Sequence, residues 1–495
     1  MDRKDSQTNE INIESNSESQ SHQPSSKDEK KNQKQSLRSY VSTAGVSIEK
    51  RMKRRTAGKE KMATTPRSSL RNVYIKHIYI LTHDGKPIFS SHGDEHTFTS
   101  HFRLIYLLIN SFKTNQDDIE SIATGGKRFV FLLKPEFIFA IFSNTNLSVS
   151  QLKMQLDDVY YQVLSFLMFC NSRKTFAGNP YMYVGRHLKG AVRIIRGLTN
   201  TEHGNQINKN IFRFLTRSVQ ILPLKNSDRS SITDIIQRKC KTRKHNLLFA
   251  IIMIDNQLIT LICKNNVSMD PGDLRLIFNF VDTLEPSEFE LPWYKPFFLP
   301  RYDRKAYLHA HISILTQSCR ACVLFITSET DDFFNLSLIK KSITKSMEDS
   351  PFPSVINEAV LRSKQSLRYS FSVDFPKMMH FVYKPTGLQQ LICTEFSGLN
   401  TSCEKYRYIE DLYCKLIDRL HKTDRPAISV YEARESEVMI GWLSPEYELY
   451  AVFEPYHERS KIIDNLNEII QYVRRKFRTL FIKKYATFCV GQSMI

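Results

Sequence analysis

The chain has 495 residues, 41% of them hydrophobic, so it is long enough for about two to four domains with sizeable cores. Its formal net charge of +19 predicts an anionic partner, such as membrane lipid, nucleic acid or an acidic protein surface, with a basic solvated surface as the alternative. No stretch of about 20 uncharged apolar residues is present, and the polar N-terminus MDRKDSQTNE has neither a signal-peptide core nor a glycine for myristoylation. The nine scattered cysteines are typical of a reducing cytosol.

Residues 1–72 are rich in Ser, Asn, Gln, Lys and Glu and poor in apolar residues, which predicts a disordered tail. Its second half turns basic, in EKRMKRRTAGKEKM (49–62). Such a run could hold the chain on an anionic membrane, serve as a nuclear-import address, or stay solvated with no dedicated partner.

A first folded module is expected over 73–174. The stretch HIYILTHDGKPIFSSHGDE (77–95) has two strand-like runs around Asp84-Gly85, which predicts a hairpin because Gly accepts positive φ at no steric cost. It has a single Gly, so it lacks the pattern of a phosphate-binding loop. A helix over 101–112, two strands within 127–143 and a helix over 148–169 follow, with Ser148 or Ser150 as candidate caps.

The helix HFRLIYLLINSF (101–112) is apolar on two sides. Phe102 and Ile109 share one face, and Leu104, Leu107 and Leu108 point away from it. A helix that is apolar on two faces is expected to be buried on both. A sheet would cover one face, and either a second chain or this chain's own connector would cover the other.

The pattern hairpin, helix, antiparallel strands, helix recurs twice more. A mostly helical connector is expected over 175–243, a second module over 244–350, a linker over 351–375, and a third module over 376–495. The segments LKPEFIFAIF (133–142) and LSPEYELYAVF (443–453) resemble each other, which indicates an internal repeat. The predicted fold class is therefore α+β, with three modules that each pack helices on an antiparallel sheet.

No pattern for covalent chemistry stands out. Walker, dinucleotide-binding, nucleophile-elbow and kinase sequences are missing, so no catalytic residue and no cofactor is predicted. Cys319 and Cys322 form the one CxxC pair, but on a strand they would face opposite sides, so no metal site is predicted. Asp157 and Asp158 are neighbours on a helix and do not face each other, which argues against paired acid–base work.

The C-terminal stretch YVRRKFRTLFIKKY (472–485) interleaves cations with aromatic residues. This pattern fits a helix on anionic lipid or a nucleic-acid channel. It also fits a helix whose Phe477 and Leu480 are core and whose cations are solvated.

Several stretches carry a resemblance to a known family: HIYILTHDGKPIFSSHG, QLDDVYYQVLSFL (155–167), LPWYKPFFLPRYDRKAYLHAHISIL (291–315), SETDDFFNLS (328–337) and ELYAVFEP (448–455). In their order they resemble the vacuolar fusion protein Mon (SAND) family, over about residues 73–485. The resemblance implies three longin domains, in agreement with the three modules. It also implies pairing with the Ccz subunit, guanine-nucleotide exchange on the late-endosomal Rab GTPase, and recruitment by the early-endosomal Rab GTPase and phosphatidylinositol 3-phosphate. The chain would then be cytoplasmic and peripheral on endosome and vacuole or lysosome membranes.

The candidate site residues follow from that expectation. For the GTPase or partner-subunit surface we choose Leu104, Leu108 and Asn110. Trp293, expected in a Pro-rich loop between strands, is the candidate contact for the recruiting Rab, with a lid on its own core as the alternative. The lipid candidates are the basic tail 49–61 and the cluster Arg474, Arg475, Lys476, Arg478, Lys483 and Lys484.

Two other functions stay open at this point. A longin-type adaptor or tether would bind a loaded GTPase without exchanging its nucleotide. A nucleic-acid binder would lose affinity steeply with salt. We do not favour this hypothesis.

Overall fold

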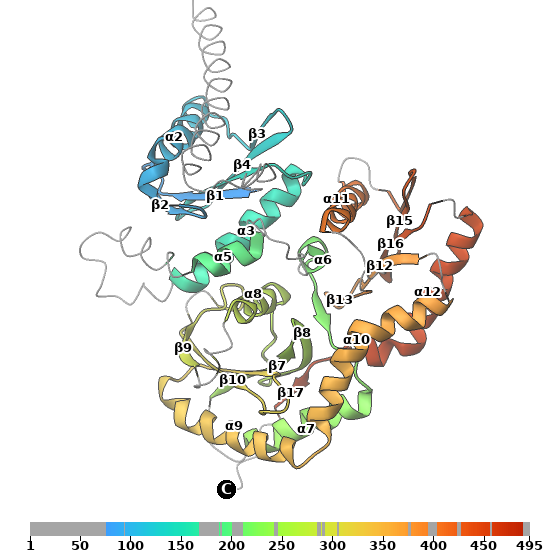
Figure 1. Ribbon diagram of the computed structural model, residues 1–495. Helices are drawn as coiled ribbons and strands as arrows, with labels where there is room; N and C mark the ends of the chain where they lie inside the picture. Colours follow the sequence, from blue (N-terminus) through green and yellow to red (C-terminus); the bar gives the residue numbers. More distant parts are fainter. Residues whose placement is uncertain are drawn as a thin grey trace, which may run out of the picture. The chain divides into compact units, whose positions relative to one another are not determined.

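The computed structural model describes residues 76–93, 95–167, 188, 191–199, 211–241, 246–284, 289, 293–303, 306–374, 378–394, 403–422, 427–455 and 458–488. All of these residues belong to one compact unit, 71–495. The predicted tail 1–72 lies outside the described residues. Figure 1 shows the elements in chain order.

Three modules repeat one element order, and each contains a hairpin, a helix, three antiparallel strands and a second helix. The first module consists of β1 (Lys76–Leu81), β2 (Pro87–Ser90), α2 (Thr99–Thr114), β3 (Ser121–Thr124), β4 (Lys127–Leu133), β5 (Ile138–Ser143) and α3 (Val149–Leu167), with the short helix η1 (Glu95–Phe98) before α2. The second consists of β7 (Leu247–Ile254), β8 (Gln257–Cys263), α8 (Pro271–Asp282), β9 (Trp293–Phe297), β10 (Leu308–Ile314), β11 (Cys322–Thr327) and α9 (Phe333–Glu348), with η4 (Thr330–Asp332) before α9. The third consists of β12 (Met378–Pro385), β13 (Gln390–Cys393), α11 (Cys403–Leu420), β14 (Ser429–Ala433), β15 (Val438–Leu443), β16 (Tyr447–Phe453) and α12 (Arg459–Leu480).

The strand order is the same in all three modules. It is β2-β1-β5-β4-β3 in the first, β8-β7-β11-β10-β9 in the second and β13-β12-β16-β15-β14 in the third. The internal repeat and the α+β class predicted from the sequence are thereby confirmed.

Strand alternation places a helix on each face of every sheet, because successive side chains of a strand point to opposite faces. In the first module Ile78 and Ile80 pack with α3, whereas Tyr79 and Leu81 pack with α2 on the other face. The second module packs α8 on one face and α7 (Asn226–Lys241) with α9 on the other. The third packs α11 and α12 in the same way. In Figure 1, α2 and α3 lie on the two sides of the first sheet.

The first hairpin turns at the predicted Asp84-Gly85. Gly85 has φ +78°, and a Cβ at this position would lie 2.6 Å from the ring of Tyr106 in α2. Both the backbone conformation and the close approach of the helix therefore require glycine here.

In each module, the sequence did not predict the first of the three strands that precede the last helix. These strands, β3, β9 and β14, each lie at one end of a module's strand order. Those with described burial are partly exposed, as in β3, where three of the four residues are exposed. A half-exposed edge strand has little apolar alternation, so its periodicity is too weak to detect.

The connector and the chain end join the second and third sheets. Strand β6 (Val219–Ile221) pairs in parallel with β13 and with β8, so one 12-stranded sheet runs through both modules. The short strand β17 (Ala486–Thr487) adds to β8. The first module has its own five-stranded sheet. Between the second and third modules, the predicted linker 351–375 spans the helix α10 (Phe352–Asp374).

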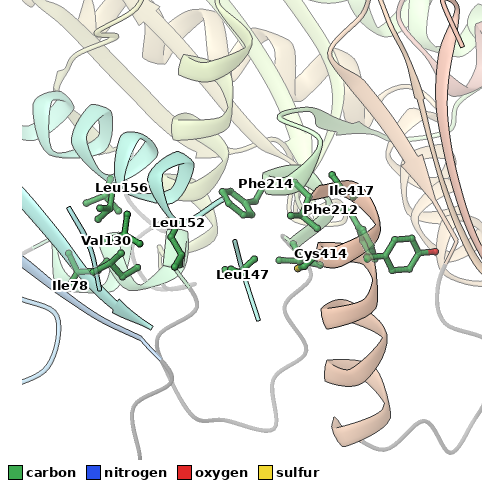
Figure 2. Packing of buried hydrophobic residues seen from close by; sticks show 14 of the residues in the cluster. Ile78, Val130, Leu147, Leu152, Leu156, Phe212, Phe214, Cys414 and Ile417 are labelled. Atoms are coloured by element: carbon green, nitrogen blue, oxygen red, sulfur yellow. The ribbon is translucent and has the colours of Figure 1, made fainter. Parts of the chain in front are cut away.

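Helices attach the first module to the rest of the compact unit. One apolar cluster includes Leu152 and Leu156 of α3, Phe212 of the short helix α6 (Ile211–Leu215), and Ile417 of α11. Figure 2 shows Phe212 and Phe214 between the residues of α3 and those of α11.

The start of α3 shows how the sequence forms this junction. Ser148 and Gln151 make a reciprocal capping box, in which Gln151 N donates to Ser148 Oγ at 3.2 Å and Ser148 N donates to Gln151 Oε1 at 3.1 Å. The amide nitrogen of Gln151 then donates to the Cys414 carbonyl of α11 at 2.9 Å. Gln151, the partner of the predicted cap Ser148, is therefore also part of the contact between the first and third modules.

Candidate functional surfaces

Helix α2 presents the first candidate surface. Its inward face carries Phe102, Ile105 and Ile109, which are buried on the sheet. On the outward side Leu107 is 62% exposed and Asn110 is exposed. Leu104 is half-buried, and Leu108 is 9% exposed, so the predicted second apolar face is open to solvent mainly at Leu107.

Trp293 lies in a strand, which corrects the loop expected from its Pro-rich surroundings. It is the first residue of β9, and its backbone is in register with Ile312 of β10. Strand β9 ends the strand order of the large sheet, and an edge strand tolerates Pro296 because proline lacks the N–H that a second neighbour would need. The Trp293 side chain lies outside the described residues.

The six C-terminal cations are all exposed. Helix α12 turns Val473 and Leu480 into the core, with Phe477 half-buried on it. Arg474 pairs with Glu446 at 2.8 Å, with both side chains largely exposed. In the described part of the chain, no ion pair is found for the other cations of the set, which are Arg475, Lys476, Arg478, Lys483 and Lys484.

Asp157 and Asp158, neighbours on α3, bind cations from three parts of the chain. Arg275 of α8 donates to Asp158 twice, at 2.8 and 3.0 Å. Lys134 donates to Asp157 at 2.8 Å, and Arg217, just after α6, approaches both carboxylates at 3.8 and 3.9 Å. These carboxylates link the first module to the connector and to the second module. Arg275 lies 117 positions from Asp158 in the sequence, so no local sequence signal could have shown that these two residues pair.

A buried histidine marks the junction of the connector with the third module. His380 of β12 stacks on Phe212 with ring centroids 4.9 Å apart, and its Nδ1 lies 2.8 Å from the Tyr413 hydroxyl. Burial lowers the pKa of His380 to about 3, so this ring is neutral at physiological pH.

Cys319, Cys322 and Asp332 contribute to packing and hydrogen bonding inside the second module. Cys319 and Cys322 are buried, and burial raises the pKa of Cys322 to about 12, which leaves it a thiol. Asp332 accepts from Thr327 Oγ1 at 2.6 Å and from Asn246 N at 3.1 Å. Within the described ranges, no group of three or more His, Cys, Asp or Glu side chains could hold a metal ion. Within these same ranges, no helix is both long and apolar enough to cross a bilayer.

Family models match the chain in the order of the three modules. The first, second and third longin domains of FUZ, MON1 and HPS1 match residues 76–198, 245–345 and 377–477. The first match extends into α5 (Val192–Thr199). The fold and these matches define a protein with three longin domains.

Relatives extend the comparison across the connector. The chain is 25% identical to vacuolar fusion protein MON1 homolog A of Macaca fascicularis over 413 residues, which is 83% of this chain and 72% of the relative. It is 26% identical to Protein SAND of Takifugu rubripes, over 77% of that protein, and 26% identical to the vacuolar fusion protein MON1 homolog of Arabidopsis thaliana, over 70% of it. The chain belongs to the MON1 (SAND) family of three-longin proteins.

Proposed function

We propose that the chain is a subunit of a guanine-nucleotide exchange factor that activates the late-endosomal Rab GTPase and so drives endosome maturation and vacuole or lysosome fusion. The observation that supports this most is the series of three longin matches in a chain aligned over 83% with proteins named for vacuolar fusion. An exchange factor binds the nucleotide-free GTPase better than the loaded form, which lowers the barrier to nucleotide release. That activity needs a shaped surface and no nucleophile.

The proposed exchange surface is composite. The first longin domain would pair with a Ccz subunit, and α2 would contribute to the shared platform through Leu107 and Asn110, next to the predicted Leu104 and Leu108. The exposed Leu107 supports this assignment, because a large apolar side chain on an otherwise packed domain is the kind of residue that partner surfaces use. On the same proposal, Trp293 on the edge strand β9 contacts the recruiting early-endosomal Rab.

The test is release of a fluorescent guanine nucleotide from the late-endosomal Rab, with this chain alone and with its Ccz partner. Acceleration is expected only with both subunits. Leu107→Asp is expected to reduce the rate roughly tenfold or more, since removing an interface anchor commonly costs over 1 kcal/mol. Leu361→Asp is the matched control, because Leu361 is 57% exposed on α10 and is not part of the proposed platform.

No acceleration with a well-folded complex would overturn the exchange function. Binding to the loaded GTPase alone would then favour the adaptor or tether. If Leu107→Asp and Leu361→Asp reduced the rate of nucleotide release equally, α2 would not be part of the platform. That result would not contradict the exchange function.

The proposed membrane surface is the cationic side of α12 and the residues after it. A cation near an anionic leaflet contributes about 1 kcal/mol. Reversal of Arg475, Lys476 and Arg478 to Glu is therefore expected to weaken binding to vesicles containing phosphatidylinositol 3-phosphate at least about tenfold. Reversal of Lys225, Arg238 and Lys241, which are exposed at or near α7, changes the net charge equally and serves as the control in a vesicle flotation assay. Equal losses for the two triple variants would show that net charge, and not α12, governs binding.

A further inference from the structure

The sheet that joins the second and third modules is narrow at β6. This strand has three residues, and it pairs in parallel with β13 and with β8 at two positions each. Val219 N donates to the Gln389 carbonyl at 3.0 Å, and Leu222 N donates to the Leu258 carbonyl at 2.9 Å. Parallel pairing is slightly less stable per residue than antiparallel pairing, and so short a contact has few hydrogen bonds. The pairing of β6, here called the seam, is by itself a weak restraint on the two modules.

A segment that follows α12 spans the seam. Residues 481–488 form this segment, the C-terminal strap. Its first residue, Phe481, is 2% exposed in an apolar cluster of the third module, and its last, Phe488, is 9% exposed in a cluster of the second module. Lys483 and Lys484, between them, are exposed. The strap is therefore anchored at its two ends, in two different modules.

Gln390 of β13 holds the third-module end of the strap. Its amide nitrogen donates to the Ile482 carbonyl, and its amide oxygen accepts from Ile482 N, both at 2.9 Å. The side chain thus pairs with the strap as the backbone of a neighbouring strand would. Gln390 is 1% exposed. Because a buried polar group that loses its partner is costly, this amide strongly favours the attached strap.

Arg229 of α7 fixes the point at which α12 ends and the strap begins. Its guanidinium donates to the carbonyls of Thr479, Leu222 and Ile259, each at 2.9 Å. A cation at the C-terminus of a helix is favourable, because the last carbonyls carry partial negative charge. Ile259 belongs to β8 and Leu222 directly follows β6. One side chain therefore connects the last turn of α12 with the seam and with the second module.

Backbone pairing and a second glutamine hold the other end. Strand β17 of the strap pairs in parallel with β8, and Phe488 N donates to the Cys263 carbonyl at 2.8 Å. Gln237 of α7 donates from its amide nitrogen to the Thr487 carbonyl at 2.7 Å. Because the strap binds β8 as β6 does, it forms a second connection between the same two modules.

We propose that the C-terminal strap is a latch on the seam: the pairing of β6 opens only in molecules whose strap has detached. The physical reason is the position of the two anchors. Since they lie in different modules, separating the modules at β6 breaks the contacts of the strap at the same time. Gln390 and Gln237 are the residues that hold the latch closed. This inference goes beyond the exchange function and does not depend on it.

Native-state amide hydrogen exchange of the purified full-length chain tests the latch. The probes are the N–H groups of Val219 in the seam and of Ile482 and Phe488 at the two ends of the strap. Exchange at each requires a local opening, so its rate reports the population of the open state. If the seam opens only after the strap detaches, a substitution that favours detachment speeds exchange at all three probes by the same factor.

Two variants loosen the strap from opposite ends. Gln237→Leu removes one hydrogen bond at Thr487, and it is expected to speed exchange at the distant Ile482 and at Val219 roughly two- to tenfold. Gln390→Leu removes two hydrogen bonds, and it is expected to speed exchange at Phe488 and Val219 at least about tenfold. Gln237 is less buried than Gln390, so the first variant keeps the test valid if the second does not fold.

The matched control is Thr344→Val. It removes one hydrogen bond of the same kind, from Thr344 Oγ1 to the Leu315 carbonyl at 2.8 Å, between α9 and the loop that follows β10. No change at the three probes is expected for it. The proposal is overturned if each glutamine variant speeds exchange only at its own end of the strap, if Val219 is unaffected by both, or if Thr344→Val speeds exchange as much as Gln237→Leu does.

Discussion

The junction between the second and third modules differs in kind from the junction that holds the first module. The second and third modules share one sheet through β6, so backbone hydrogen bonds carry their contact. The first module has a separate sheet and is held by side chains of α3, α6, α8 and α11. A backbone junction tolerates most side-chain changes, whereas a side-chain junction depends on a few residues. The first module is therefore the part whose attachment single substitutions can alter most.

The largest expected effect concerns the buried pair of α3 and α8. Arg275→Met leaves Asp158 buried without its bidentate partner, and loss of one member of a buried pair costs about 3–5 kcal/mol. Lys153→Met removes the half-buried partner of the exposed Glu120, which lies 2.8 Å away, and surface pairs contribute about 0–1 kcal/mol. Urea unfolding measures both. Equal shifts of the two midpoints would mean that the α3–α8 pair does not stabilise the attachment of the first module.

The next effect concerns the sheet junction. Val219 N donates to the Gln389 carbonyl at 3.0 Å, so Val219→Pro removes this hydrogen bond and is expected to cost about 3 kcal/mol. Val219→Ala keeps the N–H and serves as the control for the lost side chain. Amide hydrogen exchange is expected to rise in β8 and β13 and to stay unchanged in β1 and β5. Faster exchange in all of these strands would contradict the separation of the two junctions.

The smallest effect is a pH dependence at the connector. The pKa of His380 falls from 6.5 to about 3 on folding, so its contribution to stability is fully present above pH 6.5 and is lost as the pH falls from 6.5 toward 3. The loss approaches about 1.4 kcal/mol per pH unit within that window. His380→Gln keeps a polar side chain that does not titrate. The difference between the urea midpoints of the two proteins is expected to shrink or reverse on going from pH 7.5 to 5.5, and a constant difference would contradict the assignment.

Much of the fold could be predicted from the sequence, because the central strands and the helices have strong periodicity. The hairpin at Gly85 and the three repeated modules are examples. Strands β3 and β14 escaped because edge strands alternate weakly, and β9 was hidden by Pro296, which is compatible with a strand only at an edge. The exposure of the six cations after Val473 was also predictable, since Val473 and Leu480 define the buried side of α12.

The contacts between modules could not be predicted. From the sequence, Asp157 and Asp158 are only neighbours on a helix that do not face each other. Their partners Arg217, just after α6, and Arg275 of α8 are distant in the sequence, and no local pattern connects them. The burial of Leu108 beside the exposed Leu107 has the same origin, since both are apolar and only the three-dimensional packing distinguishes them. The attachment site of the C-terminal strap likewise exists only after β13, α7 and β8 have assembled.

Strand β17 has a consequence for how this protein is made. Ala486 pairs with Ile262, so a strand of the second module's sheet is contributed from beyond the third module. While the chain leaves the ribosome, β6 can already pair with the start of β8, but the end of β8 at Ile262 and Cys263 waits with an unpaired edge until the third module has been synthesised. Exposed strand edges recruit other chains. Between the translation of β8 and that of β17, this end of β8 is therefore open to pairing with other chains.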